Sequence, residues 1–97
     1  MSRNRNGHRF RSRVERVGSS HCIDLEPRLT RALRAHPERP HPVRVVLGGL
    51  EFDTRLAPIG DGTHRLVLPA WVWKDLHASP GDVLVGHLWT HEPETKR

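Results

Sequence analysis

Apolar and polar residues alternate in several short stretches of this chain, which is the pattern of half-buried β-strands. In the first stretch, residues 9–14, Phe10 and Val14 lie on one face and three arginines lie on the other. In the next stretch, Ile23 and Leu25 are expected to face inward. The same alternation predicts further strands over residues 43–47, 50–56, 64–68 and 83–89.

Two segments show helical spacing instead. Pro27 suits the first turn of a helix that continues to His36. Three apolar residues share one face of this helix: Leu29, Ala32 and Leu33. A second short helix is expected over residues 70–76, directly after Pro69.

Glycine and proline mark the connections between these elements. The pair Gly48 and Gly49 predicts a two-residue hairpin turn, since both glycines accept positive φ. Pro58 is expected to end the strand that follows this turn. Other turns are predicted at residues 18–20, 60–62 and 79–82, and an extended proline-rich loop at 37–42.

The predicted order of elements repeats within the chain. Each half runs from a strand through a proline and a short helix to another strand, with Pro27 and Pro69 in matching places. A repeat of about forty residues indicates that neither half buries its apolar face alone. We therefore expect a mainly β fold with two short helices, in which two pseudo-symmetric halves close one barrel over residues 9–91. Residues 1–8 are expected to form a disordered basic arm, and residues 92–97 a frayed tail.

The segment from Leu66 to Leu88 resembles the half-barrel motif of the AbrB and MazE type, in which hairpins interlock. Five residues fall at the intervals of that motif: Pro69, Leu76, Gly81, Asp82 and Val83. The resemblance implies a single-chain double-split β-barrel of the AbrB-like kind. Many barrels of this kind bind DNA.

Over residues 9–90 the chain is also similar to a bacterial family of small barrel domains of unknown function. Its members occur alone or fused to a YdeI/OmpD-associated segment. The similarity rests on four stretches in order: residues 45–56, 60–62, 66–69 and 80–82. It implies the same barrel, built from both halves of one chain, and it implies no particular activity.

The positive charge of the chain is concentrated at its N-terminal end. The formal net charge is +5, and residues 1–16 contain six arginines against one glutamate, so they account for the whole excess. Such clusters are typical of segments that bind nucleic acid or another polyanion, although they also occur in solvated tails.

We interpret the chain first as a binding module with nucleic acid as its leading partner. In the AbrB type, basic residues just after the proline and one turn later tend to face DNA. Arg28 and Arg31 take those places in the first half, whereas the second half has Ala70 and Trp73. The residues predicted to contact nucleic acid are Arg3, Arg5, Arg9, Arg11, Arg13, Arg28 and Arg31.

The three tryptophans support a second hypothesis for the function. Trp71 and Trp73 are two positions apart and cannot share a helix face, while Trp89 shares a strand face with Val83 and Val85. Exposed tryptophan often marks a ligand wall or an interface. The second hypothesis is therefore a barrel that binds a small molecule or a protein partner through Trp71, Trp73 and Trp89. The third is a structural or oligomerising domain, such as a homodimer.

The sequence carries no recognised motif for catalysis, metal binding or a cofactor. Eight histidines are present, but their spacing matches no zinc motif. Cys22 is the single cysteine, which excludes an internal disulfide framework. The chain has neither a signal peptide nor an apolar run of about 18 residues. We therefore expect a cytoplasmic protein that is not an enzyme and has no membrane partner.

Overall fold

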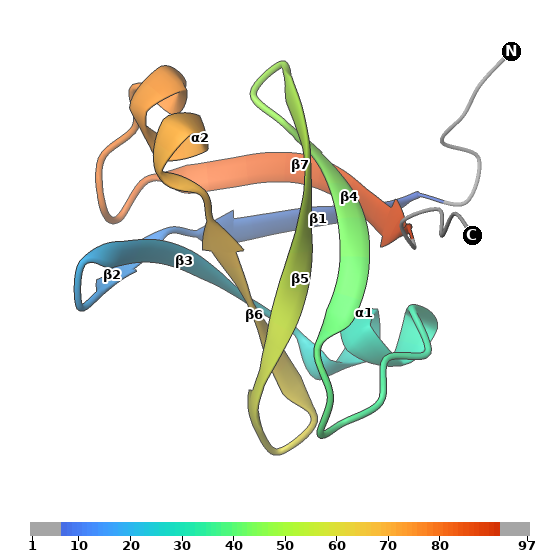
Figure 1. Cartoon of the computed structure of the whole chain (residues 1–97). Coiled ribbons are helices and arrows are strands. Elements are labelled where there is room, and N and C mark those ends of the chain that lie inside the picture. Colours follow the sequence, from blue (N-terminus) through green and yellow to red (C-terminus); the bar gives the residue numbers. More distant parts are fainter. Residues whose placement is uncertain (1–6, 92–97) are drawn as a thin grey trace, which may run out of the picture.

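The computed structural model describes residues 7–91, which form seven strands and two short helices (Figure 1). The strands are β1 (His8–Arg13), β2 (Glu15–Val17), β3 (Ser20–Leu25), β4 (His41–Leu47), β5 (Leu50–Gly60), β6 (Thr63–Leu68) and β7 (Val83–Thr90). The helices are α1 (Pro27–Ala32) and α2 (Ala70–Leu76). Most of the predicted N-terminal arm and the whole predicted tail lie outside the described residues.

The seven described strands join one antiparallel sheet in the order β1-β7-β4-β5-β6-β3-β2. The sheet curls into a half-barrel, with α1 and α2 on opposite sides of it (Figure 1). Its two outermost strands, β1 and β2, are consecutive in the chain and meet at the fully buried Val14. The prediction of a mainly β fold with two short helices is confirmed.

A bulge fixes the bend between β1 and β2 to the start of β7. The Val14 amide donates to the Asp82 carbonyl at 2.9 Å, and the Val14 carbonyl accepts from the Gly81 amide at 2.8 Å. Gly81 and Asp82 therefore both lie opposite Val14. Gly81 has φ 96, a backbone angle at which a side chain is rarely tolerated. This explains the Pro-Gly-Asp turn that the sequence shows at this point.

The inner face of the curled sheet carries the hydrophobic core. The alternation predicted the inward residues of β3, β4 and β6 correctly, and α2 adds Val72 to them. The fully buried apolar residues are Val14, Ile23, Leu25, Val43, Val45, Leu47, Leu56, Leu66, Val72 and Leu88. These residues come from both halves of the chain, so neither half has a core of its own.

The strand register relates the two halves by an internal twofold. Ile23 pairs with Leu66 where β3 meets β6, and Val45 pairs with Leu88 where β4 meets β7. Both pairs join residues 43 positions apart, as a single twofold axis through both ladders requires. The predicted repeat is therefore present in the structure.

The helices follow the same offset. Each is followed by a residue in the left-handed region, Arg34 at φ 61 after α1 and His77 at φ 57 after α2. These two residues are again 43 positions apart. In this register Glu26 corresponds to Pro69, so the alignment of Pro27 with Pro69 expected from the sequence is wrong by one residue.

The apolar alternation of the last strand does not mark its inward face. Val83 and Val85 are each 41% exposed, whereas Gly86 and Leu88 are buried. Gly86 explains the difference, because a Cβ at this position would lie 2.6 Å from the Val46 carbonyl oxygen and 2.8 Å from the Phe10 ring. The inner face of β7 is therefore shaped by a glycine, which the apolar alternation of the sequence does not reveal.

The first helix and the fifth strand also differ from expectation. The helix α1 ends at Ala32, four residues before His36, and its buried residue is Thr30 rather than the exposed Ala32. The Thr30 hydroxyl lies 3.0 Å from the Pro27 carbonyl oxygen and 2.9 Å from the Gly62 carbonyl oxygen, which draws this face inward. Pro58 does not end β5, because a register shift lets the strand continue to Gly60. The short β2 was not predicted.

Candidate functional site

Within residues 7–91 one edge of β1 has no strand paired with it, and the hydrogen-bond register shows which groups face this edge. The His91 amide donates a hydrogen bond to the Pro42 carbonyl at 3.2 Å. Backbone hydrogen bonds alternate along an antiparallel strand, so the odd-numbered residues of β7 bond to β4 and the even-numbered residues of β7 bond to β1. The hydrogen bond from Val14 to Asp82 agrees with this alternation, because it joins two even-numbered residues. In β1, therefore, the even-numbered residues bond to β7, and Arg9 and Arg11 direct their amides and carbonyls toward the open edge.

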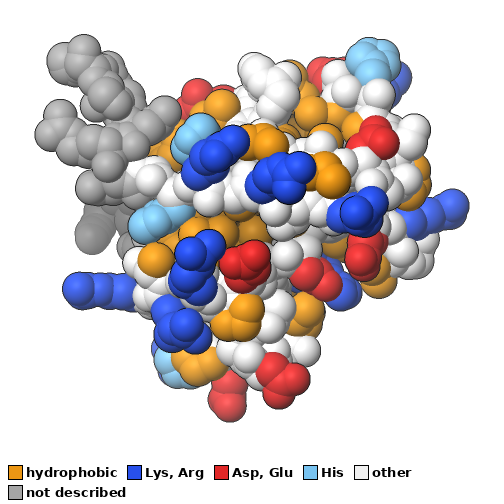
Figure 2. Space-filling view, turned by 180° about the vertical axis from the view of Figure 1, so that it is seen from behind, with side chains coloured by type: hydrophobic (Ala, Val, Ile, Leu, Met, Phe, Trp, Pro, Cys, Tyr) orange, Lys and Arg blue, Asp and Glu red, His pale blue; other side chains and the backbone are white. Residues whose placement is uncertain are grey.

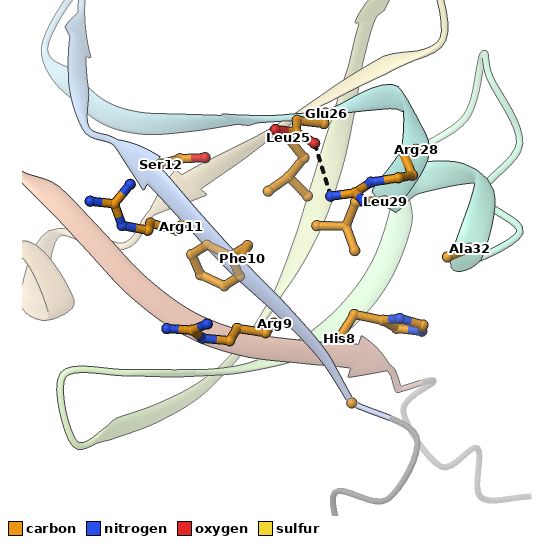
Figure 3. Close-up of a pocket in the computed structure, with 11 residues that line it drawn as sticks. His8, Arg9, Phe10, Arg11, Ser12, Leu25, Glu26, Arg28, Leu29 and Ala32 are labelled. Carbon is orange, nitrogen blue, oxygen red and sulfur yellow. Dashed lines mark hydrogen bonds and ion pairs between the residues drawn. The ribbon is translucent and has the colours of Figure 1, made fainter.

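A groove of about 540 Å³ lies between this edge and the start of α1 (Figure 3). The size is within the range of small-molecule and cofactor sites. Its apolar lining comes from Phe10, Leu25, Leu29 and Ala32, and its polar lining comes from His8, Arg9, Arg11, Ser12, Glu26 and Arg28. The groove arises because β1 pairs with β7, whereas β2, which begins after Val14, pairs with β3. The edges of β1 and β3 therefore diverge from Val14.

Arg9 and Arg11 of β1 also line the groove. Figure 3 shows Arg9 and Arg11 on the side of β1 that faces away from α1. Both side chains are exposed, and within residues 7–91 neither makes an ion pair. Arg13 continues the row and donates to the Gly81 carbonyl at 3.0 Å. The row therefore presents positive charge that the described part of the molecule leaves unneutralised.

Two arginines elsewhere on the sheet are paired with aspartates, whereas Arg16 and Arg55 make no ion pair within residues 7–91. Arg44 donates to Asp53 at 2.7 and 3.0 Å, and Arg65 donates to Asp24 at 2.6 and 3.1 Å. The bond from Arg44 lowers the pKa of Asp53 below its ordinary value. Figure 2 shows basic side chains spread over the face behind Figure 1, with apolar side chains exposed between them. The unpaired arginines of β1 are thus distinct from these structural ion pairs.

The arginines predicted on α1 have different positions. Arg28 lines the groove and bonds to Glu26 at 3.3 Å, but both side chains are largely exposed, so this pair adds little stability. Arg31 is exposed on α1 and is not part of the groove lining. Arg3 and Arg5 lie outside the described residues. The structure therefore brings Arg9, Arg11 and Arg28 to one groove.

The three tryptophans do not line one pocket. Trp71 is 50% exposed and packs edge-on against Phe52 with ring centroids 6.2 Å apart. Trp73 stacks on His21 at 3.8 Å. Trp89 lies at the far end of β7 from α2 and pairs with Arg44 in the β4–β7 ladder (Figure 1).

The internal twofold shows that the second half fills the place corresponding to the groove. The offset of 43 residues equates Arg28 with Trp71. The ladders relate His8 to Phe52, because their partners Leu88 and Val45 are equivalent, although His8 and Phe52 are 44 and not 43 positions apart. Two aromatic rings thus meet in the second half where His8 and Arg28 line an open groove in the first.

Sequence reasoning missed His8, Ser12, Leu25 and Glu26 as groove residues. Their alternation and turn positions resemble those of ordinary barrel residues. The signal that could have found the groove is the contrast between the aromatic residues of one half and their polar equivalents in the other. Reading that contrast requires the equivalence of residues between the two halves, which the strand register gives.

The remaining titratable groups do not form a second site. Within residues 7–91 no three side chains of the metal-binding types cluster together. Cys22 is buried in β3, and burial raises the pKa of its thiol. His64 is fully buried, and its Nε2 lies 3.2 Å from the Arg39 carbonyl oxygen, which fixes the proline-rich loop to β6. No helix among the described residues is long and apolar enough to cross a membrane.

The fold and the groove define a small curled β-sheet domain with one amphipathic groove at its open strand edge. The model of the family described as "Domain of unknown function (DUF1905)" matches residues 6–87. The chain therefore belongs to the DUF1905 family. A search of curated proteins found no match. The family agrees with the expected family of domains of unknown function, whereas a link to a YdeI/OmpD-associated segment or to the AbrB type stays a prediction.

Proposed function

We propose that this DUF1905 domain is a binding module rather than an enzyme, and that it holds an anionic ligand along β1 beside the groove. The observation that carries the proposal is the pair Arg9 and Arg11. These side chains are exposed, make no ion pair within residues 7–91, and adjoin an open strand edge. Charge that the fold does not neutralise is available to a ligand.

Nucleic acid is the first anionic ligand to consider. Its phosphates would contact the arginine row of β1, with Arg28 and Arg31 on α1 as further contacts. The AbrB-like double-split barrel belongs to this proposal, because interlocked halves of that kind would produce the equivalent ladders of β3 with β6 and β4 with β7. A cytoplasmic location is part of the same prediction.

The test is a fluorescence anisotropy titration of labelled single-stranded and duplex DNA over a series of salt concentrations. We expect micromolar binding that weakens with salt, with a logarithmic slope of about 0.7 to 0.9 per phosphate contact. Arg9→Ser and Arg11→Ser should each reduce both the affinity and this slope. The matched control is Lys74→Ser, which removes one positive charge from α2 and should leave binding unchanged.

Point substitutions are preferable to a long truncation. Removing residues 1–16 would delete β1, together with the buried Phe10 and Val14, and would disrupt the core. Removing residues 1–6 leaves β1 intact and measures the contribution of Arg3 and Arg5. If neither DNA nor polyglutamate binds the full chain at low salt, the proposed function is wrong.

The half-exposed Trp71 supports the second candidate, a patch that binds a protein or small molecule. Because Trp71, Trp73 and Trp89 do not converge, this candidate is restricted to Trp71 and its neighbour Phe52. Trp71→Ala should then abolish any ligand-induced change in tryptophan fluorescence. A homodimer stays a prediction, which sedimentation over a range of protein concentrations would test.

A further inference from the structure

The open edge of β1 offers a binding surface that differs from a simple row of charges. Arg9 and Arg11 each direct one backbone donor and one backbone acceptor outward, and no hydrogen bond of residues 7–91 reaches these groups. A phosphate backbone only accepts hydrogen bonds, so it would leave both carbonyls without a donor. A peptide strand presents donors and acceptors in the same alternating order as the edge.

We propose that an extended peptide adds to the open edge of β1 and occupies the groove, with acidic residues on one face and apolar residues on the other. This inference rests on the proposed function and identifies its anionic ligand as a peptide. The groove is lined by consecutive residues 7–12, a length of about 20 Å in a strand. An added strand of about five residues would therefore pair along it.

The two faces of β1 determine the sequence that such a peptide needs. Residues directly opposite Arg9 and Arg11 would lie on the exposed face of the sheet, where cross-strand pairs of opposite charge are favourable. The intervening residues would lie on the face of Phe10, above Leu25 and Leu29. The preferred ligand thus alternates acidic and small apolar side chains.

The second half of the chain shows how this groove would look if it were closed. Trp71 on α2 packs against Phe52 on β5, and these residues correspond to Arg28 and His8. In the first half the equivalent elements, α1 and β1, carry the polar side chains Arg28 and His8, and the space between these elements is open. The twofold is therefore broken at the place where the peptide would bind.

The experiment measures binding of a labelled heptapeptide of alternating glutamate and valine to the full chain. Three comparison probes are a peptide with lysine in place of glutamate, the acidic peptide with alternate backbone amides N-methylated, and single-stranded DNA. We expect the acidic peptide to bind most tightly. N-methylation should weaken its binding at least about tenfold, because it removes hydrogen bonds to the edge.

A matched pair of variants separates backbone pairing from charge. Arg11→Ala removes the side chain but keeps the outward amide, whereas Arg11→Pro removes both and spares the bonds to β7. We expect Arg11→Ala to weaken the acidic peptide by up to about fivefold. Arg11→Pro should weaken it by up to about tenfold more. DNA binding should respond equally to both, and circular dichroism of both variants establishes that the sheet is retained.

Each failure has a separate meaning. If DNA binds and the acidic peptide does not, the peptide inference is overturned and the proposed function stands. Equal binding of the N-methylated peptide, or equal effects of Arg11→Ala and Arg11→Pro on the peptide, also overturns strand addition. If the lysine peptide binds as well as the glutamate peptide, the peptide inference is overturned, and if DNA also fails to bind, the anionic function itself is wrong. If no probe binds, both proposals fail.

Discussion

Gly86 on β7 lies close to residues of both neighbouring strands. Its position is set by contact and not by an unusual backbone angle, since a Cβ here would meet Val46 on one neighbouring strand and Phe10 on the other. Phe10 is also part of the groove lining, so the glycine leaves room for this ring beside β7. A single residue thus links the packing of the sheet to the shape of the groove.

Replacing Gly86 with alanine should destabilise the fold. The added methyl group meets a backbone oxygen that cannot move without disturbing the β4–β7 ladder, so we expect a loss of about 1–3 kcal/mol in the free energy of unfolding. Urea denaturation followed by circular dichroism measures it. His87→Ala, the exposed neighbour, should change stability by less than about 0.5 kcal/mol. Equal effects of the two substitutions would show that close packing at Gly86 is unimportant.

At the level of elements, α1 is held in place by a buried polar contact as well as by the packing of Leu29 against the core. Thr30 is 2% exposed, and its hydroxyl reaches the Gly62 carbonyl in the turn between β5 and β6. The partly buried Leu29 on the same helix lines the groove. The position of α1, and hence the width of the groove, therefore depends on this hydrogen bond.

Thr30→Val should weaken the attachment of α1. The substitution keeps the shape of the side chain but leaves the Gly62 carbonyl without this donor, which should reduce stability by about 1–3 kcal/mol. Thr54→Val on β5 makes the same chemical change where the hydroxyl has no bond within residues 7–91, and it serves as the control. Hydrogen exchange should show faster exchange in α1 only for Thr30→Val. Unchanged exchange would mean that other contacts hold the helix.

The elements differ in how well the sequence specifies them. The helix α2 was predicted with its observed bounds, because Pro69 begins it and the residues after it form a clear turn. The sequence does not specify the inward face of β7, because Val83 and Val85 are as apolar as core residues and only close contact identifies Gly86 as inward. Helix α1 was predicted too long, because the left-handed position after it is occupied by Arg34 and not by a glycine that would mark the helix end.

At the scale of the whole molecule, the class of fold could be predicted and the site could not. Strand alternation and the repeated proline-helix units were sufficient for a mainly β barrel-like domain with two related halves. The groove depends on a difference between those halves, and it becomes visible only when His8 is compared with Phe52 and Arg28 with Trp71. The basic row was recognised, but its relation to an open strand edge required the ladder register.

The central claim is that the groove beside β1 is the binding site, and filling it tests this claim most directly. A variant with His8→Phe and Arg28→Trp would reproduce in the first half the aromatic contact that Phe52 and Trp71 make in the second. The measurement is the affinity of this variant for the acidic heptapeptide, beside its urea midpoint. The account predicts unchanged or higher stability and a loss of peptide binding of at least about tenfold, since burying two rings is favourable and the space is then occupied. Full peptide affinity in a stable, filled variant would contradict it.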